Sequence, residues 1–294
     1  MKYVITGSTG NISLPLAQKL IAAGHDITII SSDESKSSVI EQLGAKPAIG
    51  NLFDTDFLTQ TFTGADAAYI MIPPTFTTND WPAFMKQAAD SYVQAVAQSG
   101  LKKVVQLSSI GAHLGHSCGP IDGLGYLEQQ LGKLTNVEVI SLRAAYFYTN
   151  LFSMVPLIQQ AGIMGSNFGA AGEKMALVHP ADIAEVAAQK LLSLDFIGHS
   201  TLYVSSDVRP FSEIAKVVGS AVGKPELPWV VFSDEDAYNG MIQAGLPETN
   251  AQGYLQMGKA FRSGIAQEDY FATNAQPQGS FKLEAFAQIL AQAV

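Results

Sequence analysis

The 294-residue sequence has little charge and a single cysteine. Charged residues make up 15% of the chain and hydrophobic residues 47%, a composition that is typical of a folded globular protein and excludes a long disordered tract. Because a disulfide needs two thiols, the lone Cys118 excludes an internal disulfide and favours a reducing compartment. Basic residues are also scarce, 17 against 26 acidic ones. The net charge of −9 argues against broad binding to nucleic acid or to anionic membranes.

Long apolar runs are missing as well. None is long enough to cross a bilayer, and Met1-Lys2 leads directly into an expected strand, so we expect neither a transmembrane segment nor a signal peptide. Together with the single cysteine, this predicts a cytoplasmic protein. The length allows one large domain, or a domain with a smaller lobe.

Residues 2–24 at the start of the chain show a strand–turn–helix pattern. An apolar, β-branched run at 3–5 predicts a buried strand, and Ile12, Leu16 and Leu20 recur at helical spacing after it. A sharp turn over residues 7–10 therefore joins the strand to the helix. Such a turn directs backbone N–H groups and the positive end of the helix dipole at one point, which suits a phosphate.

The glycine spacing in this turn resembles the G-x-x-G-x-x-G pattern of dinucleotide-binding loops. Gly7 allows the tight turn, Gly10 lets a pyrophosphate approach the backbone, and the small Ser13 takes the third position. The alternatives are a purely structural turn and a nucleoside-triphosphate loop, but no Gly-Lys-Ser/Thr closes the turn. We predict a dinucleotide contacted here by Gly7, Ser8, Thr9, Gly10, Asn11 and Ile12.

Further along the chain, strand and helix patterns alternate. Strands are expected at 3–5, 27–30, 46–50, 67–72, 103–107, 137–142 and, as the last, 201–204; helices at 12–21, 37–44, about 57–62, 81–99, 126–134 and 178–191; and a loop at 111–125. This order predicts an α/β fold with a doubly wound, parallel Rossmann sheet. We expect a core over 1–148 and a smaller C-terminal substrate lobe over 149–294, with 175–205 returning to the core. The lobe should cover the carboxyl edge of the sheet, where ligands bind.

The residues after the second strand predict the choice of cofactor. Ser31 and Ser32 supply hydroxyls and Lys36 an ammonium, which together can hold a 2′-phosphate, so we expect NADP(H) rather than NAD(H). Asp33 is the alternative, because a carboxylate that reaches the ribose hydroxyls favours NAD. The predicted cofactor site is completed by residues at the ends of other strands: Asn51, Leu52, Ile72, Pro73 and Ser108.

A loop after the fifth strand carries His113, His116 and Cys118 in a His-x-x-His-x-Cys pattern. A closed zinc site needs four ligands, and only Asp122 is near, so we predict no metal. The remaining interpretations are a solvated loop without chemistry and a loop that contacts the substrate.

Four residues are candidates for the substrate pocket. Ser108 and His113 lie at the end of the fifth strand or just after it. Ser108 either lies beside the nicotinamide or serves the turn that ends the strand. Tyr146 and Phe147 follow the sixth strand and either pack in the core or form the wall of a flat aromatic pocket.

At the level of motifs the chain resembles the NmrA-like family of atypical short-chain dehydrogenase/reductases. VITGSTGNIS resembles the nucleotide loop of that family, LRAAYFYTN its L-R-P-x-x-F-x-x-N segment, LVHPADIAEVAA its Asp-Ile-Ala segment, and GKPELPWVVFSDEDAYNGMIQAGLPE its substrate lobe. The resemblance implies NAD(P)H binding and a small-molecule substrate. Some members are similar to NADPH:quinone oxidoreductases, and others are regulators that bind a dinucleotide and a protein partner.

The chain departs from the wider superfamily at its catalytic Tyr-x-x-x-Lys pair. If Glu128 matches the helix glutamate of the family, Pro120 stands in the tyrosine place and Leu124 in the lysine place. Tyr126 has Gln130, not lysine, four residues later, and Ser32 replaces the basic residue that grips a 2′-phosphate. We therefore predict an oxidoreductase that reduces a planar acceptor such as a quinone without this pair. The alternative is a non-catalytic redox-sensing regulator.

Overall fold

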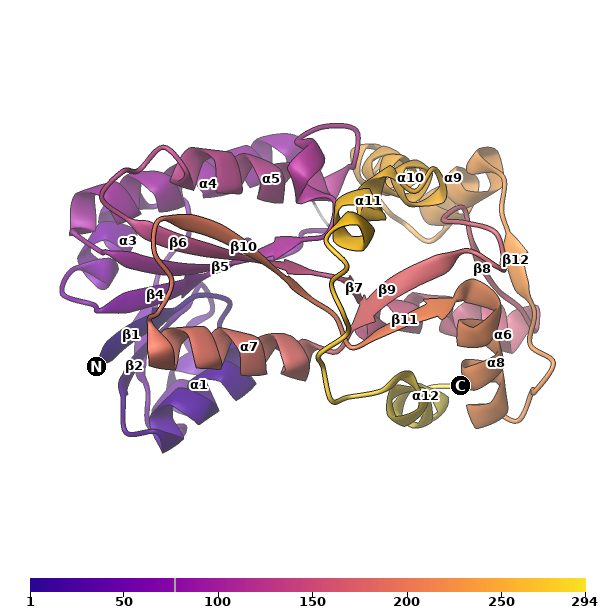
Figure 1. Cartoon of the computed structure of the whole chain (residues 1–294), viewed down its shortest axis with the longest axis horizontal. Coiled ribbons are helices and arrows are strands. Elements are labelled where there is room, and N and C mark those ends of the chain that lie inside the picture. The colour runs from indigo at the N-terminus through magenta and orange to yellow at the C-terminus, as the bar shows by residue number, and fades with distance from the viewer. Residues whose placement is uncertain (77) are drawn as a thin grey trace.

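The computed structural model describes residues 1–76 and 78–294, and a sheet of seven parallel strands forms its centre (Figure 1). The strands lie in the order β10-β6-β5-β4-β1-β2-β3, so the direction of winding reverses between β1 and β4. The predicted doubly wound sheet is confirmed, and this reversal is where such sheets bind ligands. The strands are β1 (Lys2–Ile5), β2 (Asp26–Ser31), β3 (Lys46–Ile49), β4 (Ala67–Ile70), β5 (Lys103–Ser109), β6 (Glu138–Ala144) and β10 (His199–Val204).

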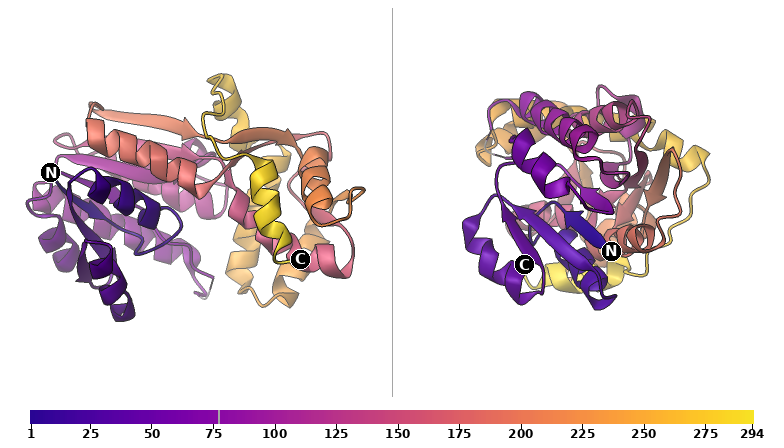
Figure 2. Two further views of the ribbon diagram at one scale, coloured as in Figure 1. Left: turned by 90° about the horizontal axis from the view of Figure 1, so that it is seen from below. Right: turned by 90° about the vertical axis from the view of Figure 1, so that its left-hand side faces the viewer.

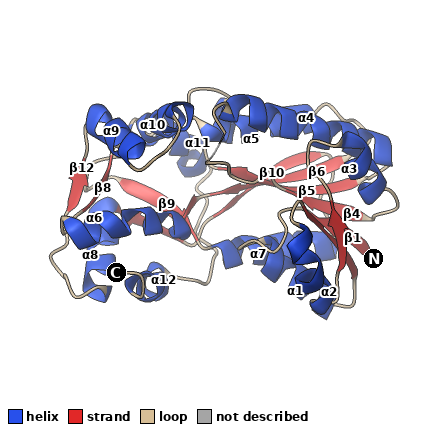
Figure 3. Cartoon of the chain, turned by 180° about the vertical axis from the view of Figure 1, so that it is seen from behind, coloured by secondary structure: helices blue, strands red, loops and turns tan. Residues whose placement is uncertain are grey.

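Helices cover both faces of this sheet (Figure 3). One face carries α1 (Ser13–Ala22), α2 (Ser37–Gln42) and α7 (Pro180–Ser193), and the other carries α3 (Thr55–Phe62), α4 (Trp81–Ser99) and α5 (Pro120–Leu131). Each helix layer closes over its own apolar cluster, so both faces of the sheet are buried, as a parallel sheet requires. Among the described residues, no helix combines the length and the apolar character needed to span a membrane.

The rest of the chain forms the predicted lobe beyond the carboxyl ends of the central strands (Figure 2). Its two small sheets have the orders β11-β9-β7 and β12-β8. The chain enters this lobe after β6 and returns to the core for α7 and β10, while the boundary at residue 148 stays a prediction. The lobe elements are β7 (Tyr146–Phe147), β8 (Met164–Ser166), β9 (Lys174–Val178), β11 (Asp207–Pro210), β12 (Trp229–Val231), α6 (Val155–Gln160), α8 (Phe211–Ala221), α9 (Asp234–Gln243), α10 (Glu248–Arg262), α11 (Ile265–Ala272) and α12 (Leu283–Ala291). Short 3₁₀ helices complete the chain: η1 (Glu34–Lys36), η2 (Ala112–Leu114) and η3 (Tyr148–Met154).

The predicted loop at 111–125 is wrong in its second half, because α5 begins at Pro120 and ends at Leu131 rather than running over 126–134. Proline is favoured in the first turn of a helix, and the Asp122 carboxylate accepts the N–H of Cys118 at the helix start. Gly125, which looks like a loop residue, serves packing instead. A Cβ there would lie 2.4 Å from the carbonyl oxygen of Ala112.

The prediction that residues 201–204 form the last strand is also wrong. Two short strands, β11 and β12, follow β10, and β12 pairs with β8, in a segment without a clear period. β8 and β12 have only three residues each, too few to show a period, and β11 reads Asp-Val-Arg-Pro, without an apolar run.

The lobe approaches the core most closely where α10 meets the starts of α4 and α5. Gly119 precedes α5, and a Cβ at this position would lie 2.0 Å from the carbonyl oxygen of Gly253 in α10. A Cβ on Gly253 would in turn lie 2.8 Å from Nε1 of Trp81, the first residue of α4. Two glycines thus let the backbone of the lobe pack against the core.

We predict that Gly119→Ala destabilises the protein more than Gly198→Ala does. Both glycines have positive φ, +60° and +63°, so alanine costs about 1–3 kcal/mol of backbone strain at either position. Only at Gly119 would the added Cβ clash with another residue, and this overpacking increases the loss of stability by about 1–3 kcal/mol. Urea unfolding of the two variants measures the difference. Equal losses of unfolding free energy would contradict the close approach of α10.

Candidate functional site

The turn between β1 and α1 is built for close backbone contact. Gly7 has φ +89°, and a Cβ there would lie 2.6 Å from Oγ of Ser13. The Ser13 hydroxyl donates to the carbonyl oxygen of Thr6 at 2.7 Å, and Ser13 is 2% exposed, so this small residue fills the third position of the motif. The N–H of Gly10 donates to the carbonyl oxygen of Gly7 at 3.1 Å, which closes the turn.

The part of this turn that precedes α1 is accessible to solvent. Gly10 and Asn11 are exposed, and Ser8 and Thr9 are partly exposed. Within the described residues, no side chain caps the helix at Ile12. A phosphate group can therefore take the place of a cap at this helix start.

The segment after β2 places its polar groups in two different ways. The Ser31 hydroxyl is buried: it accepts a hydrogen bond from Ser8 Oγ at 3.0 Å and another from the N–H of Asp33 at 3.1 Å. Ser32 is exposed and Lys36 partly exposed. Ser31 thus fixes the loop, whereas Ser32 and Lys36 remain accessible to a 2′-phosphate.

Asp33 faces the following turn. Its Oδ1 accepts the N–H of Ser35 at 2.9 Å and the Ser35 hydroxyl at 2.6 Å, and these bonds lower the pKa of the Asp33 carboxyl. Both of these hydrogen bonds use Oδ1, so the cap leaves Oδ2 of this exposed carboxylate for another partner. The choice between NADP(H) and NAD(H) thus stays a prediction.

The remaining predicted cofactor contacts lie after β3 and β4. Asn51 is exposed and its Oδ1 accepts the N–H of Phe53 at 3.0 Å, while Leu52 is half-buried. Ile72 is buried and Pro73 partly exposed, just after β4. The predicted contacts from β1, β2, β3 and β4 thus follow the carboxyl ends of neighbouring strands in the sheet.

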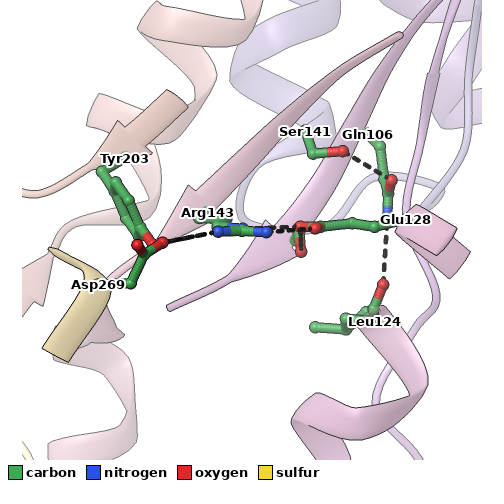
Figure 4. Close-up of polar contacts among 8 residues, drawn as sticks. Gln106, Leu124, Glu128, Ser141, Arg143, Tyr203 and Asp269 are labelled. Atoms are coloured by element: carbon green, nitrogen blue, oxygen red, sulfur yellow. Dashed lines mark hydrogen bonds and ion pairs between the residues drawn. The ribbon is translucent and has the colours of Figure 1, made fainter. Parts of the chain in front are cut away.

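Ser108 belongs to a buried charge network at the end of β5. Its hydroxyl donates to Glu128 Oε1 at 2.5 Å, and Arg143 donates to both oxygens of the same carboxylate, at 3.1 and 2.8 Å (Figure 4). Arg143 also donates to Asp269 Oδ2 at 3.0 Å, and that carboxylate accepts the Tyr203 hydroxyl. Ser108 therefore joins β5 to α5, and its contact with a cofactor stays a prediction.

His113 has no partner for its ring. Both ring nitrogens are buried and, among the described residues, neither forms a hydrogen bond. Buried polar atoms are nearly always paired in folded proteins, and leaving one unpaired costs about 1–3 kcal/mol. The ring thus has hydrogen-bonding capacity that a ligand can satisfy, which keeps His113 a candidate for the pocket.

Cys118 and Asp122 serve the start of α5. Cys118 is fully buried, and burial raises the pKa of its thiol to about 12. Both oxygens of Asp122 accept the N–H of Cys118, at 3.0 and 3.2 Å. Over the described ranges 1–76 and 78–294, no three His, Cys, Asp or Glu side chains gather as metal ligands do. Cys118 and Asp122 thus have a structural role at the start of α5.

Tyr146 and Phe147 form β7 and pack against the core of the lobe. The Tyr146 ring meets Phe168 and Phe261 edge-on, with centroids 5.5 and 6.3 Å apart. A void of about 10 Å³ beside it holds at most one water, so this side of the ring offers no room for a substrate.

Sequence reasoning missed the contacts that the lobe makes with the segment after β4. Asn250 Nδ2 donates to the carbonyl oxygen of Thr75 at 3.0 Å, and Thr249 Oγ1 to that of Asn79 at 2.9 Å. The Tyr254 ring of α10 stacks on Phe76. The two members of each pair lie about 170 positions apart in the chain, so no local sequence pattern predicts their contact.

Comparison with known proteins agrees with this geometry. Residues 7–124 match a family profile described as NAD(P)H-binding. A curated relative, the uncharacterized oxidoreductase YesF of Bacillus subtilis, is 24% identical over 266 residues, which cover 89% of this chain and 85% of the relative.

Two solved structures have the same fold over nearly their whole length. The triphenylmethane reductase of a Citrobacter species, complexed with NADP(H), has a TM-score of 0.77 and 20% identity, with 99% of this chain and 100% of that chain covered. An NADPH-dependent quinone oxidoreductase of Escherichia coli, complexed with NADPH, has a TM-score of 0.77 and 18% identity, with 98% and 99% covered. This fold is the one that the resemblance to NmrA-like, atypical short-chain dehydrogenase/reductases predicts. The chain has the fold of an NAD(P)H-binding oxidoreductase.

We predict that Gly10→Val abolishes dinucleotide binding without unfolding the protein. A Cβ at Gly10 already lies 3.0 Å from the carbonyl oxygen of Gly7, and a branched side chain would fill the space that a pyrophosphate needs. Fluorescence titration with NADPH measures the affinity, and circular dichroism checks the fold. Gly172→Val, where nothing lies within 4 Å of the added Cβ, is the control and should bind NADPH normally.

Proposed function

We propose that the protein is an NADP(H)-dependent oxidoreductase that reduces a small planar acceptor such as a quinone. The observation that carries the proposal is the open glycine turn at the winding reversal of the sheet, which faces a lobe that contributes aromatic side chains. The names of the two similar structures support it, since one is a quinone oxidoreductase and the other reduces a triphenylmethane dye.

The polypeptide contributes position and a dry site to this reaction. When bound, NADPH supplies the hydride. The turn at Gly7–Gly10 would hold the pyrophosphate, and the lobe would cover the carboxyl edge of the sheet and exclude water. Transfer of a hydride to a quinone leaves a hydroquinone monoanion, which takes its proton from water after it leaves the site.

The two residues that stand in the places of the tyrosine and the lysine offer no side-chain acid. Pro120 begins the helix, and Leu124 offers only its carbonyl oxygen, which accepts from Gln106 at 3.3 Å. The Tyr126 hydroxyl donates to Asp90 Oδ1 at 2.8 Å, and the residue lines a cavity of about 420 Å³ between α4, α5 and α10. Tyr126 is thus engaged with α4, which supports a reaction that needs no tyrosine acid.

We predict that NADPH binds more tightly than NADH and that Lys36→Ala reduces this preference. A charge-assisted contact with the 2′-phosphate is worth about tenfold in affinity, and NADH has no such phosphate. Titration of both cofactors on both proteins measures the effect, with Lys46→Ala, an exposed lysine in β3, as the control. Equal or tighter binding of NADH to the unmodified protein would contradict the cofactor choice.

We predict that NADPH oxidation with 1,4-naphthoquinone is faster than with a simple ketone by about 10²-fold or more, because a positioned general acid is worth about 10²–10⁴-fold to a ketone. Tyr126→Phe should leave quinone turnover largely intact. Loss of turnover in this variant with NADPH affinity unchanged would reveal a tyrosine acid. Tight NADPH binding with no turnover of any acceptor would favour the regulator instead.

A further inference from the structure

Two aromatic rings, one from the core and one from the lobe, face each other beyond β4. Phe76 lies in the β4–α4 segment and Tyr254 in α10, with ring planes 10° apart and centroids separated by 6.4 Å. In the other stacked aromatic pairs that the described residues form, the centroids are 3.8–5.4 Å apart. Phe76 is also 54% exposed. The two rings are therefore nearly parallel, and the Phe76 ring is partly open to solvent.

Hydrogen bonds join the core to the lobe near the two rings. On the core side, Thr75 and Asn79 accept hydrogen bonds from Asn250 and Thr249, and Asn250 is 2% exposed. On the lobe side, the carbonyl oxygen of Thr249 accepts from Trp81 Nε1 at 2.7 Å. These bonds connect the elements that carry the rings, and an arrangement formed before binding lowers the entropic cost of binding a ligand.

The pair also lies next to the predicted cofactor contacts. Phe76 follows Ile72 and Pro73 in the same segment. Tyr254 and Tyr146 both pack against the apolar cluster that extends into the lobe.

We propose that Phe76 and Tyr254 form an aromatic clamp that binds the flat ring of the acceptor. This inference rests on the proposed function and names the residues that select planar molecules. An aromatic ring stacked between them needs about 3.5 Å to each neighbour, or roughly 7 Å between the two ring planes, so the exposed Phe76 ring must turn to admit the acceptor. A planar acceptor gains a stacking contact on each face, and a puckered aliphatic ketone gains neither.

The test measures binding of 1,4-naphthoquinone to protein saturated with NADP⁺, by calorimetry, so that no turnover is needed. Phe76→Leu and Tyr254→Leu keep apolar bulk but remove a flat ring, and each should weaken binding about 3- to 10-fold. Tyr254→Phe keeps the ring and should bind like the unmodified protein. The control is Phe271→Leu, which removes a 42% exposed aromatic on α11 and should have no effect.

Unchanged naphthoquinone affinity in both leucine variants, or no binding to the unmodified protein, would overturn the clamp. Steady-state kinetics separate this result from failure of the proposed function. Turnover of naphthoquinone with a KM that both leucine variants leave unchanged would overturn the clamp and retain the enzyme. Ring-dependent binding without NADPH oxidation would support the clamp and contradict the proposed reaction.

Discussion

The ion pair between Arg143 and Glu128 is the interaction on which the arrangement of the site depends. The two side chains are only 11% and 12% exposed, so both charges have lost most of their water. Such a pair is tolerated only when its geometry is good and its remaining hydrogen-bonding atoms are satisfied. Ser108 donates a hydrogen bond to one carboxylate oxygen of Glu128, and Asp269 on α11 accepts a hydrogen bond from the guanidinium of Arg143. Losing one partner of a buried pair costs about 3–5 kcal/mol, because the other charge is left uncompensated.

This pair sets the path of the chain at the edge of the sheet. Ser108 ends β5 and Glu128 lies in α5, so the bond between them ties together both ends of the segment that carries His113. Asp269 extends the same network into the lobe. A second junction, between α10 and the β4–α4 segment, includes the hydrogen bond from Trp81 to the carbonyl oxygen of Thr249. Core and lobe are thus joined by a network of largely buried charges and by a second set of hydrogen bonds and close-packed glycines.

Local patterns predicted the parts of the fold that have a period. The helix at about 81–99 was predicted from its apolar spacing and from Gly100, and the structure agrees: Asp80 caps the helix, Pro82 lies in its first turn and Gly100 ends it with positive φ. The start of α5 was missed because glycine is typical of loops. Gly125 is needed in the helix for its close packing against Ala112, a contact that the sequence does not show. The clamp was missed for the same reason at longer range: Phe76 and Tyr254 meet only after the lobe folds back on the core. Periodicity records which face of an element is buried, but not which distant element buries it.

The tyrosines near the clamp bear on the chemistry of the proposed reaction. Burial raises the pKa of both Tyr146 and Tyr254, so both phenols stay protonated at neutral pH and are weaker acids than free tyrosine. A phenol in this state donates a hydrogen bond readily but gives up its proton reluctantly. That property suits an acceptor whose reduced oxygen is stable as an anion, and it does not suit a ketone, whose developing alkoxide requires a proton. The burial that makes these side chains poor acids thus favours the same class of substrate as the flat geometry of the clamp.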